Sequence, residues 1–99
     1  MIRRGLKRVV TAQLDLFVEE HGELLEACER ALAAYDAAPR EEAEERYGDY
    51  LDLVETGNET LAEMRDHYSA SLDERAAADY GSLFARAVAR RLPRFSVET

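Results

Sequence analysis

Two segments of nearly equal length carry apolar residues at heptad spacing, and this repeat constrains the fold more than any other feature of the chain. In residues 5–36 the repeat comprises Val10, Leu14, Phe17, His21, Leu24, Cys28, Ala31 and Tyr35. In residues 39–70 it comprises Ala43, Tyr47, Tyr50, Val54, Gly57, Leu61, Met64 and Tyr68. Steps of four and three place each set on one face of a helix. Each face needs a partner, so the sequence predicts an antiparallel, coiled-coil-like helical hairpin.

The limits of these helices are marked by residues that start or stop helices. Pro39 suits the first position of the second helix, and the glutamates that follow it favour the positive end of the helix dipole. A break at Gly57-Asn58 is an alternative, but the apolar stripe keeps its phase there, which favours a continuous helix. Ser71 to Glu74 matches a capping box and predicts a third helix over 72–92 that ends before Pro93.

These patterns predict an all-α fold in a single domain, residues 1–99. Helices 5–36 and 39–70 would form a hairpin about 48 Å long, and the shorter helix 72–92 would pack against part of it. A core built by 99 residues is small, and part of the hairpin would stay uncovered. We therefore expect a homodimer whose helices complete a bundle.

Composition narrows the class of protein. Charged residues form 34% and apolar residues 46% of the chain, a balance typical of a folded protein rather than a disordered one. Cys28 is the single cysteine, so the chain builds neither an internal disulfide nor a cysteine zinc site. No window of about 18 apolar residues is present, and the N-terminal residues lack a signal-peptide pattern, so we expect a cytoplasmic protein without a membrane span.

Charge is distributed unevenly along the chain. Residues 9–85 hold twenty of the twenty-one acidic residues against five arginines, which disfavours nucleic acid as a partner. Basic residues gather near both ends, and we predict anion binding by Arg3, Arg4, Lys7, Arg8, Arg90, Arg91 and Arg94. With three helices alternating in direction, the two basic clusters would lie at opposite ends of one subunit. A single anion-binding surface would then require a break at Gly57 or a dimer.

One group of carboxylates has the residue types of a metal site. Glu19, Glu20 and Glu23 fall within one turn of the first helix, and Asp49 and Asp52 lie on the second. If the hairpin brought these turns together, their oxygens would suit Mg²⁺ and a phosphate substrate. The chain has no phosphate loop, no nucleophile elbow and no Glu-x-x-His pair, so no other catalytic residue or cofactor is predicted.

The same carboxylates resemble a family motif. EEHGELLEA at 19–27 and YGDYLDLV at 47–54 are similar to the EExxE and ExxD motifs of the MazG-like nucleotide pyrophosphohydrolases, which are all-α enzymes. The resemblance covers about a quarter of the chain and implies Mg²⁺-dependent hydrolysis of a nucleoside triphosphate. The chain departs from the pattern at Arg46, where the family has glutamate.

Three functions follow as expectations. The leading one is a non-enzymatic interaction or structural module that binds itself or another protein. The alternative is the Mg²⁺-dependent pyrophosphohydrolase, which requires the Glu19–Glu23 turn to face Asp49 inside the bundle. The third is attachment to an anionic membrane surface through the basic N-terminus, which the acidic remainder of the chain opposes.

Overall fold

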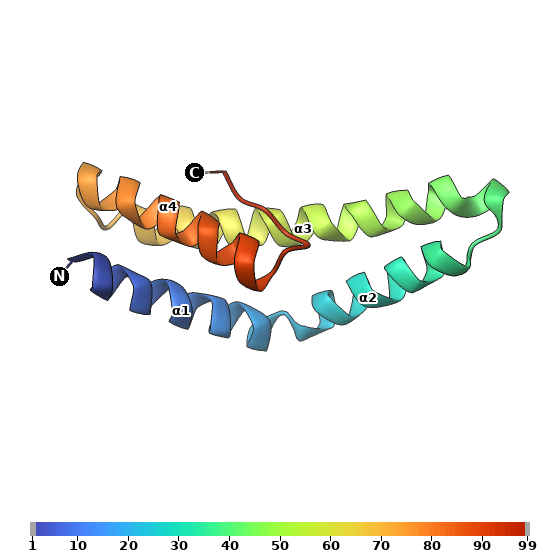
Figure 1. Ribbon diagram of the computed structural model, residues 1–99, viewed down its shortest axis with the longest axis horizontal. Helices are drawn as coiled ribbons and strands as arrows, with labels where there is room; N and C mark the ends of the chain where they lie inside the picture. The colour runs from blue at the N-terminus through green and yellow to red at the C-terminus, as the bar shows by residue number, and fades with distance from the viewer. Residues whose placement is uncertain (1, 99) are drawn as a thin grey trace.

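The protein is an elongated bundle of helices, 53 × 22 × 19 Å in extent (Figure 1). The computed structural model describes residues 2–98, so the two end residues of the predicted 1–99 domain lie outside the described range. Within it there are four α-helices, α1 (Ile2–Glu20), α2 (Gly22–Ala37), α3 (Ala43–Ser69) and α4 (Glu74–Arg91), with a 3₁₀ turn, η1 (Arg40–Glu42), and no strand. The all-α prediction is confirmed.

The molecule has two parts of different thickness. At one end α1, α4 and the second half of α3 pack together, whereas at the other end α2 pairs with the first half of α3 alone (Figure 1). We call the thicker part, with the segment after α4, the body, and the thinner part, residues 22–56, the arm. The sequence predicted this difference, because the third helix is too short to cover the whole hairpin.

The first helix of the predicted hairpin is not continuous. The helix expected over 5–36 ends at Glu20, and His21 has φ −114° and ψ 31° before α2 begins at Gly22. Glycine has a low helix propensity and is a frequent site of kinks, which accounts for the position of this break. The break redirects the chain by a local bend only, since His21 still donates to Phe17 and accepts from Leu25.

The second helix is continuous through the position where a break was considered. α3 runs unbroken across Gly57, which is buried because the ring of Phe95 lies directly against its backbone. Phe95 belongs to the segment after α4 that turns back onto the bundle, and its ring also meets Phe17 edge to face, with centroids 5.9 Å apart. Glycine at position 57 therefore allows the Phe95 ring to approach the backbone of α3 closely, and it does not mark a change of chain direction.

The third helix begins later than expected. Asp73, not Ser71, caps α4 by accepting a hydrogen bond from the Ala76 amide at 2.8 Å. Ser71 instead donates to the Tyr68 carbonyl oxygen in the preceding turn. The capping-box assignment was wrong by two residues because aspartate three positions before a free amide is an equally good cap.

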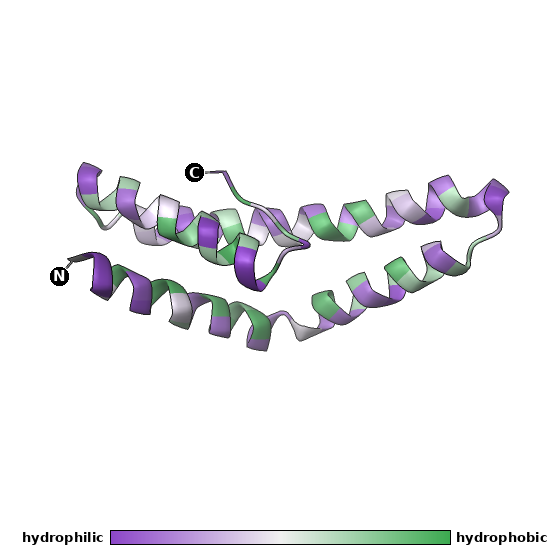
Figure 2. Cartoon of the chain, viewed as in Figure 1, coloured by the Kyte–Doolittle hydropathy of each residue, from purple (hydrophilic) through white to green (hydrophobic). Residues whose placement is uncertain are grey.

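Most of the core lies in the body, although hydrophobic residues occur along the whole length of the bundle (Figure 2). Leu14, Phe17 and Leu61 are fully buried against the apolar face of α4. That face contributes Tyr80, Leu83, Phe84, Ala87 and Val88. Tyr80 is the largest of these side chains, and its hydroxyl donates to Oε1 of Gln13 at 2.8 Å. The predicted apolar faces of α1 and α4 thus meet as expected.

Stability should fall in alkaline solution because Tyr80 ionises with difficulty. Burial raises the pKa of Tyr80 to about 12, against 10 for the free side chain. Below pH 10, Tyr80 is neutral in both the folded and the unfolded chain, and its burial contributes fully to stability. Between pH 10 and 12 it ionises in the unfolded chain but not yet in the folded one, so the free energy of unfolding should fall by up to about 2.7 kcal/mol. Denaturant melts of wild type and Tyr80→Phe between pH 8 and 12 measure this loss. Equal slopes in the two proteins would contradict it.

Candidate interaction surface

The arm has an open apolar face. Of the twelve buried apolar residues in the described range, only Cys28 lies in the arm, next to the body. Tyr47 and Leu51 on α3 are 42% and 45% exposed, and the half-buried Leu32 lies on α2, which packs against α3. On the side where α4 covers the body, nothing among the described residues covers the arm beyond its base (Figure 1). An uncovered apolar face of this kind is typical of an interaction surface.

The segment after α4 closes the base of the arm. Arg94 lies over the ring of Tyr50, with its guanidinium carbon 5.6 Å from the ring centroid. It donates to the Tyr50 hydroxyl at 3.0 Å and to the Glu29 carboxylate at 2.9 Å, so it bridges α3 and α2. Ser96 adds a hydrogen bond from its amide to the Asn58 side chain. These contacts hold the two arm helices together where the body ends.

Charge differs sharply between the two parts. The arm holds eleven acidic and three basic residues, a net of −8, whereas the rest of the chain has ten of each. Glu44 and Glu55 fall on the same side of α3 as Tyr47 and Leu51, because the spacings are three and four residues. Asp36 follows Leu32 by four residues on α2. The open apolar face is therefore bordered by carboxylates.

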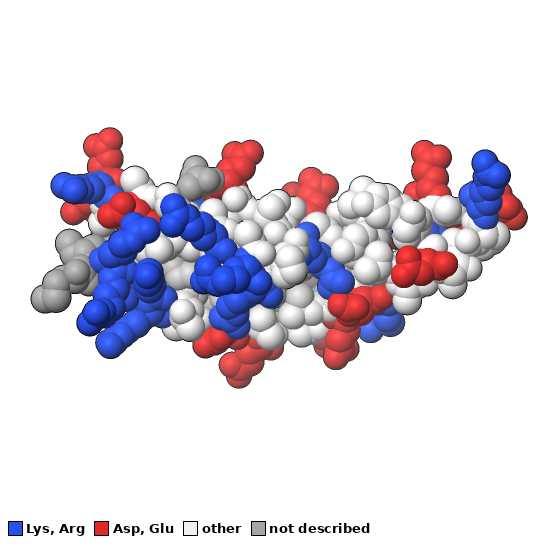
Figure 3. All heavy atoms as spheres, in the orientation of Figure 1, with Lys and Arg blue, Asp and Glu red and all other residues white. Residues whose placement is uncertain are grey.

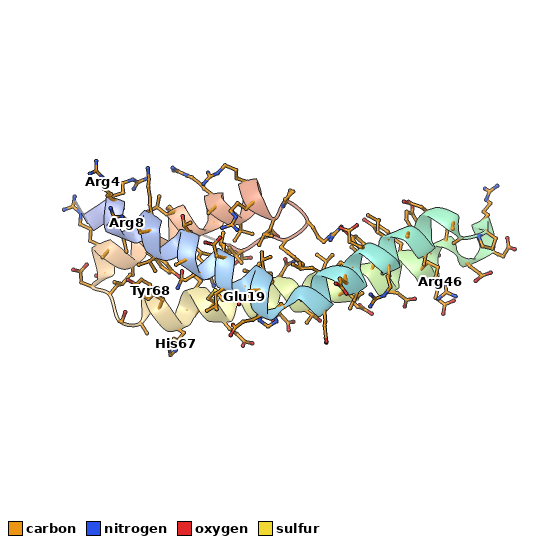
Figure 4. All side chains as sticks on the ribbon, turned by 90° about the horizontal axis from the view of Figure 1, so that it is seen from below. Arg4, Arg8, Glu19, Arg46, His67 and Tyr68 are labelled. Carbon is orange, nitrogen blue, oxygen red and sulfur yellow. The ribbon has the colours of Figure 1, made fainter. Side chains whose placement is uncertain are left out.

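A second surface feature is cationic. Within the described residues Arg4, Lys7 and Arg8 on α1, with Arg86 and Arg90 on α4, form no ion pair. Arg3 on α1 and Asp79 on α4 form an exposed ion pair between these two helices. Figure 3 shows Lys and Arg gathered over α1 and α4, and Figure 4 labels Arg4 and Arg8 near the start of α1. We call these five residues the cationic face.

The structure places the predicted anion-binding residues in two groups. Arg3, Arg91 and Arg94 have internal partners, Asp79, Asp15 and Glu29. The cationic face contains the other four, Arg4, Lys7, Arg8 and Arg90. It also contains Arg86, which was not among the predicted residues. The expectation that one subunit separates the two basic clusters was wrong. As three alternating helices require, α1 and α4 run in the same direction. Arg3 pairs with Asp79 and Arg91 with Asp15, and in this register Arg86 lies only about 3 Å further along the axis than Arg8, so the two clusters are neighbours.

The predicted metal ligands are not brought together. Glu19, Glu20, Glu23, Asp49 and Asp52 are all exposed. Tyr35 packs on Tyr47, and this antiparallel register puts Asp49 roughly 15 Å along the axis from Glu23. Asp49 pairs instead with Arg46, which Figure 4 shows far along the molecule from Glu19. In the described part of the chain no three His, Cys, Asp or Glu side chains form a potential metal site.

Two contacts at this surface were missed at the sequence level. Phe95 and Arg94 were considered only as the end of a basic tail, yet they join α1, α2 and α3. The available signal was Gly57, a glycine at an apolar stripe position of a continuous helix, which indicates close approach by another segment. Cys28 lies nearby, and burial raises the pKa of its thiol, which is typical of a structural rather than a reactive cysteine.

Comparison with protein-family models, curated proteins and solved structures finds no match for this chain. No helix in residues 2–98 is long and apolar enough to cross a membrane. The arm and the cationic face are the two surface features from which a function can be inferred.

Proposed function

We propose that the protein is a non-enzymatic protein–protein interaction module and that the open face of the arm is its docking surface. The observation that carries this proposal is the exposure of Tyr47 and Leu51 on a two-helix arm that no other helix of residues 2–98 covers. A leucine that passes from water into a well-packed interface contributes roughly 1.5–3 kcal/mol. Acidic residues around an apolar centre match the usual arrangement of a polar rim and an apolar core in protein interfaces.

Leu51→Glu should abolish association, whereas Leu16→Glu should not. The two leucines have nearly equal exposure, 45% and 47%, but Leu51 lies on the open face of the arm and Leu16 on α1. A charge in the centre of a desolvated interface costs several kcal/mol, so the dissociation constant should rise more than 100-fold for Leu51→Glu. Sedimentation velocity measures self-association, and capture from a cell extract with each protein as bait measures other partners.

One result with these two variants would contradict the proposed docking surface. If Leu51→Glu and Leu16→Glu leave both the oligomeric state and the set of captured proteins unchanged, the arm is not a docking surface. Circular dichroism of both variants checks that helix content is preserved. Because both residues are exposed in the monomer, neither substitution should unfold it.

The cationic face favours a second candidate, attachment to an anionic lipid surface. Its five basic residues have no ion-pair partner among residues 2–98, and clusters of this size bind acidic lipids. Co-sedimentation with phosphatidylserine vesicles at 0.15 M salt, and its loss in Arg86→Glu/Arg90→Glu, would support this function. The net charge of −8 opposes it.

The hydrolase alternative has a separate test. Calorimetric titration with Mg²⁺ would have to show saturable binding at 0.15 M salt that Glu20→Gln or Glu23→Gln removes. We expect weak, salt-screened association instead, since the carboxylates are exposed and apart.

A further inference from the structure

We propose that the partner of the arm is the cationic face of a second copy of this chain, in a two-fold symmetric antiparallel dimer. Each arm would lie on the body of the other subunit, so the same contact is made twice. This inference rests on the proposed function, because it requires the arm to be a docking surface. It adds the identity of the occupant and the arrangement of the two chains.

The shape of the subunit suits this arrangement. α4 covers the body and ends before the arm begins, so the face of the molecule that carries α4 has a step (Figure 1). On the face drawn in Figure 3, Lys and Arg gather over α1 and α4, whereas the arm shows a mostly uncharged surface edged by carboxylates and a few arginines. A two-fold axis across the middle of the long dimension would place the α4 layer of one subunit over the uncovered arm of the other. The uncovered side of each arm would then be covered by the other subunit.

Charge favours contact between the arm and the cationic face over contact between two arms. Two arms packed against each other would bring together two surfaces with a net charge of −8 each. Like charges at an interface core cost affinity, whereas opposed patches both attract and orient the subunits. The cationic face is the one surface of the described chain that gathers basic residues without internal partners. The arm of one copy and the cationic face of another are therefore electrostatically complementary.

The antiparallel register also matches the charges along the long axis. The start of α1, with Arg4 and Lys7, lies at the end of the molecule opposite the arm tip (Figure 1). In the dimer these residues would face Asp36 and Glu44 of the second copy. Arg86 and Arg90 lie nearer the middle and would face the base of the arm around Leu51 and Glu55. Opposite charges would thus face each other along the whole length of the contact.

The available area is sufficient for a stable dimer. The broad face measures at most 53 by 22 Å. Contact over most of it exceeds the roughly 800 Å² per partner that specific interfaces of standard size bury. A body-to-body contact would use only half of this face and would leave both arms uncovered.

Cross-linking of the wild-type protein tests the arrangement directly. Lys7 is the only lysine of the chain. A zero-length carbodiimide reagent joins its amine to a carboxylate only where the two touch. Lys7 and the arm tip are at opposite ends of one subunit, so a link from Lys7 to Asp36, Glu41 or Glu44 must join two copies. We expect such links in the dimer band. A dimer band in which Lys7 is linked only to body carboxylates would overturn the proposal.

Charge reversal gives an independent test with its own control. In one variant the cationic face becomes acidic (Lys7→Glu/Arg86→Glu/Arg90→Glu), and in the other the arm rim becomes basic (Asp36→Lys/Glu44→Lys/Glu55→Lys). Each variant alone should sediment as an 11.2 kDa monomer, whereas the 1:1 mixture should form a heterodimer of twice this mass. In that heterodimer both reciprocal contacts are again between opposite charges.

The outcomes separate this inference from the function on which it rests. A wild-type monomer at all concentrations, a dimer that survives either reversal alone, or a mixture of folded variants that stays monomeric overturns the antiparallel dimer. If such a result is accompanied by loss of another captured protein in Leu51→Glu, the arm remains a docking surface with a different partner. If Leu51→Glu changes nothing, the proposed function fails as well.

Discussion

Replacing Phe95 by alanine is expected to lower the free energy of unfolding by about 3–5 kcal/mol, the usual cost of removing a buried phenylalanine. Phe95 is only 3% exposed although it lies outside the helices, and its ring fills the space between Phe17 and Gly57. Its loss would leave a cavity at the junction of the body and the arm. Denaturant unfolding followed by circular dichroism, at a fixed protein concentration, measures the change.

A second residue of the same segment provides the control for Phe95. Val97 is half-buried two residues further along, and Val97→Ala should cost about 1 kcal/mol or less. Equal, small effects of the two substitutions would mean that the segment after α4 does not pack as described. Phe95 directly follows Arg94, which bonds Glu29 and Tyr50, so the same variants also report on the base of the arm.

Gly57→Ala should destabilise the protein by about 1–3 kcal/mol, although alanine is the better helix former. A methyl group at this position would overlap the ring of Phe95, with Cδ1 at 2.7 Å and Cζ at 2.8 Å. The ring is buried and has little room to move away. Thermal and denaturant melts of the variant at fixed protein concentration give the size of the loss.

Gly48→Ala is the matched control on the same helix. A methyl group at Gly48 meets nothing within 4 Å, so helix propensity alone acts and the variant should gain about 0.5–1 kcal/mol. In a Phe95→Ala background the cost of Gly57→Ala should largely disappear, since the obstacle is gone. Additive effects in this double-mutant cycle would show that the two residues are not in contact.

The segment after α4 lies next to the arm that the proposed dimer would cover. Phe95 and Arg94 close the bundle at the point where the α4 layer ends. The arm beyond this point has only two helices and no fully buried side chain of its own beyond Cys28 in the described residues. We therefore expect the arm to be the part of the monomer with the fastest amide hydrogen exchange, and the part most protected by a partner.

Several features were predictable from local sequence. The heptad spacing identified the apolar faces, and Val10, Leu14, Phe17 and Leu61 are buried as that spacing requires. The stripe kept its phase across Gly57, and α3 is continuous there. The short third helix already implied an uncovered part of the hairpin. All of these depend on the helical period and on helix length, which are local properties of the chain.

Other features depended on contacts between distant residues. The bend at His21 was not predicted, because the apolar stripe crosses it in phase, although Gly22 beside it lowers the local helix propensity. The separation of Asp49 from Glu23 follows from the register of α2 against α3, which Tyr35 and Tyr47 help to set. The carboxylates of the two motif-like segments therefore do not form a common site, although each segment lies within one helix.

The sequence by itself determined the helices, their apolar faces and the acidic character of the segment that became the arm. Only the tertiary structure decided the register in which α4 lies beside α1, which brings basic residues from both ends of the chain onto one face. It also decided that Phe95 packs on Gly57. The physical reason is that helix formation and apolar spacing act over three or four residues, whereas the meeting of two surfaces depends on how whole helices fill the space between them.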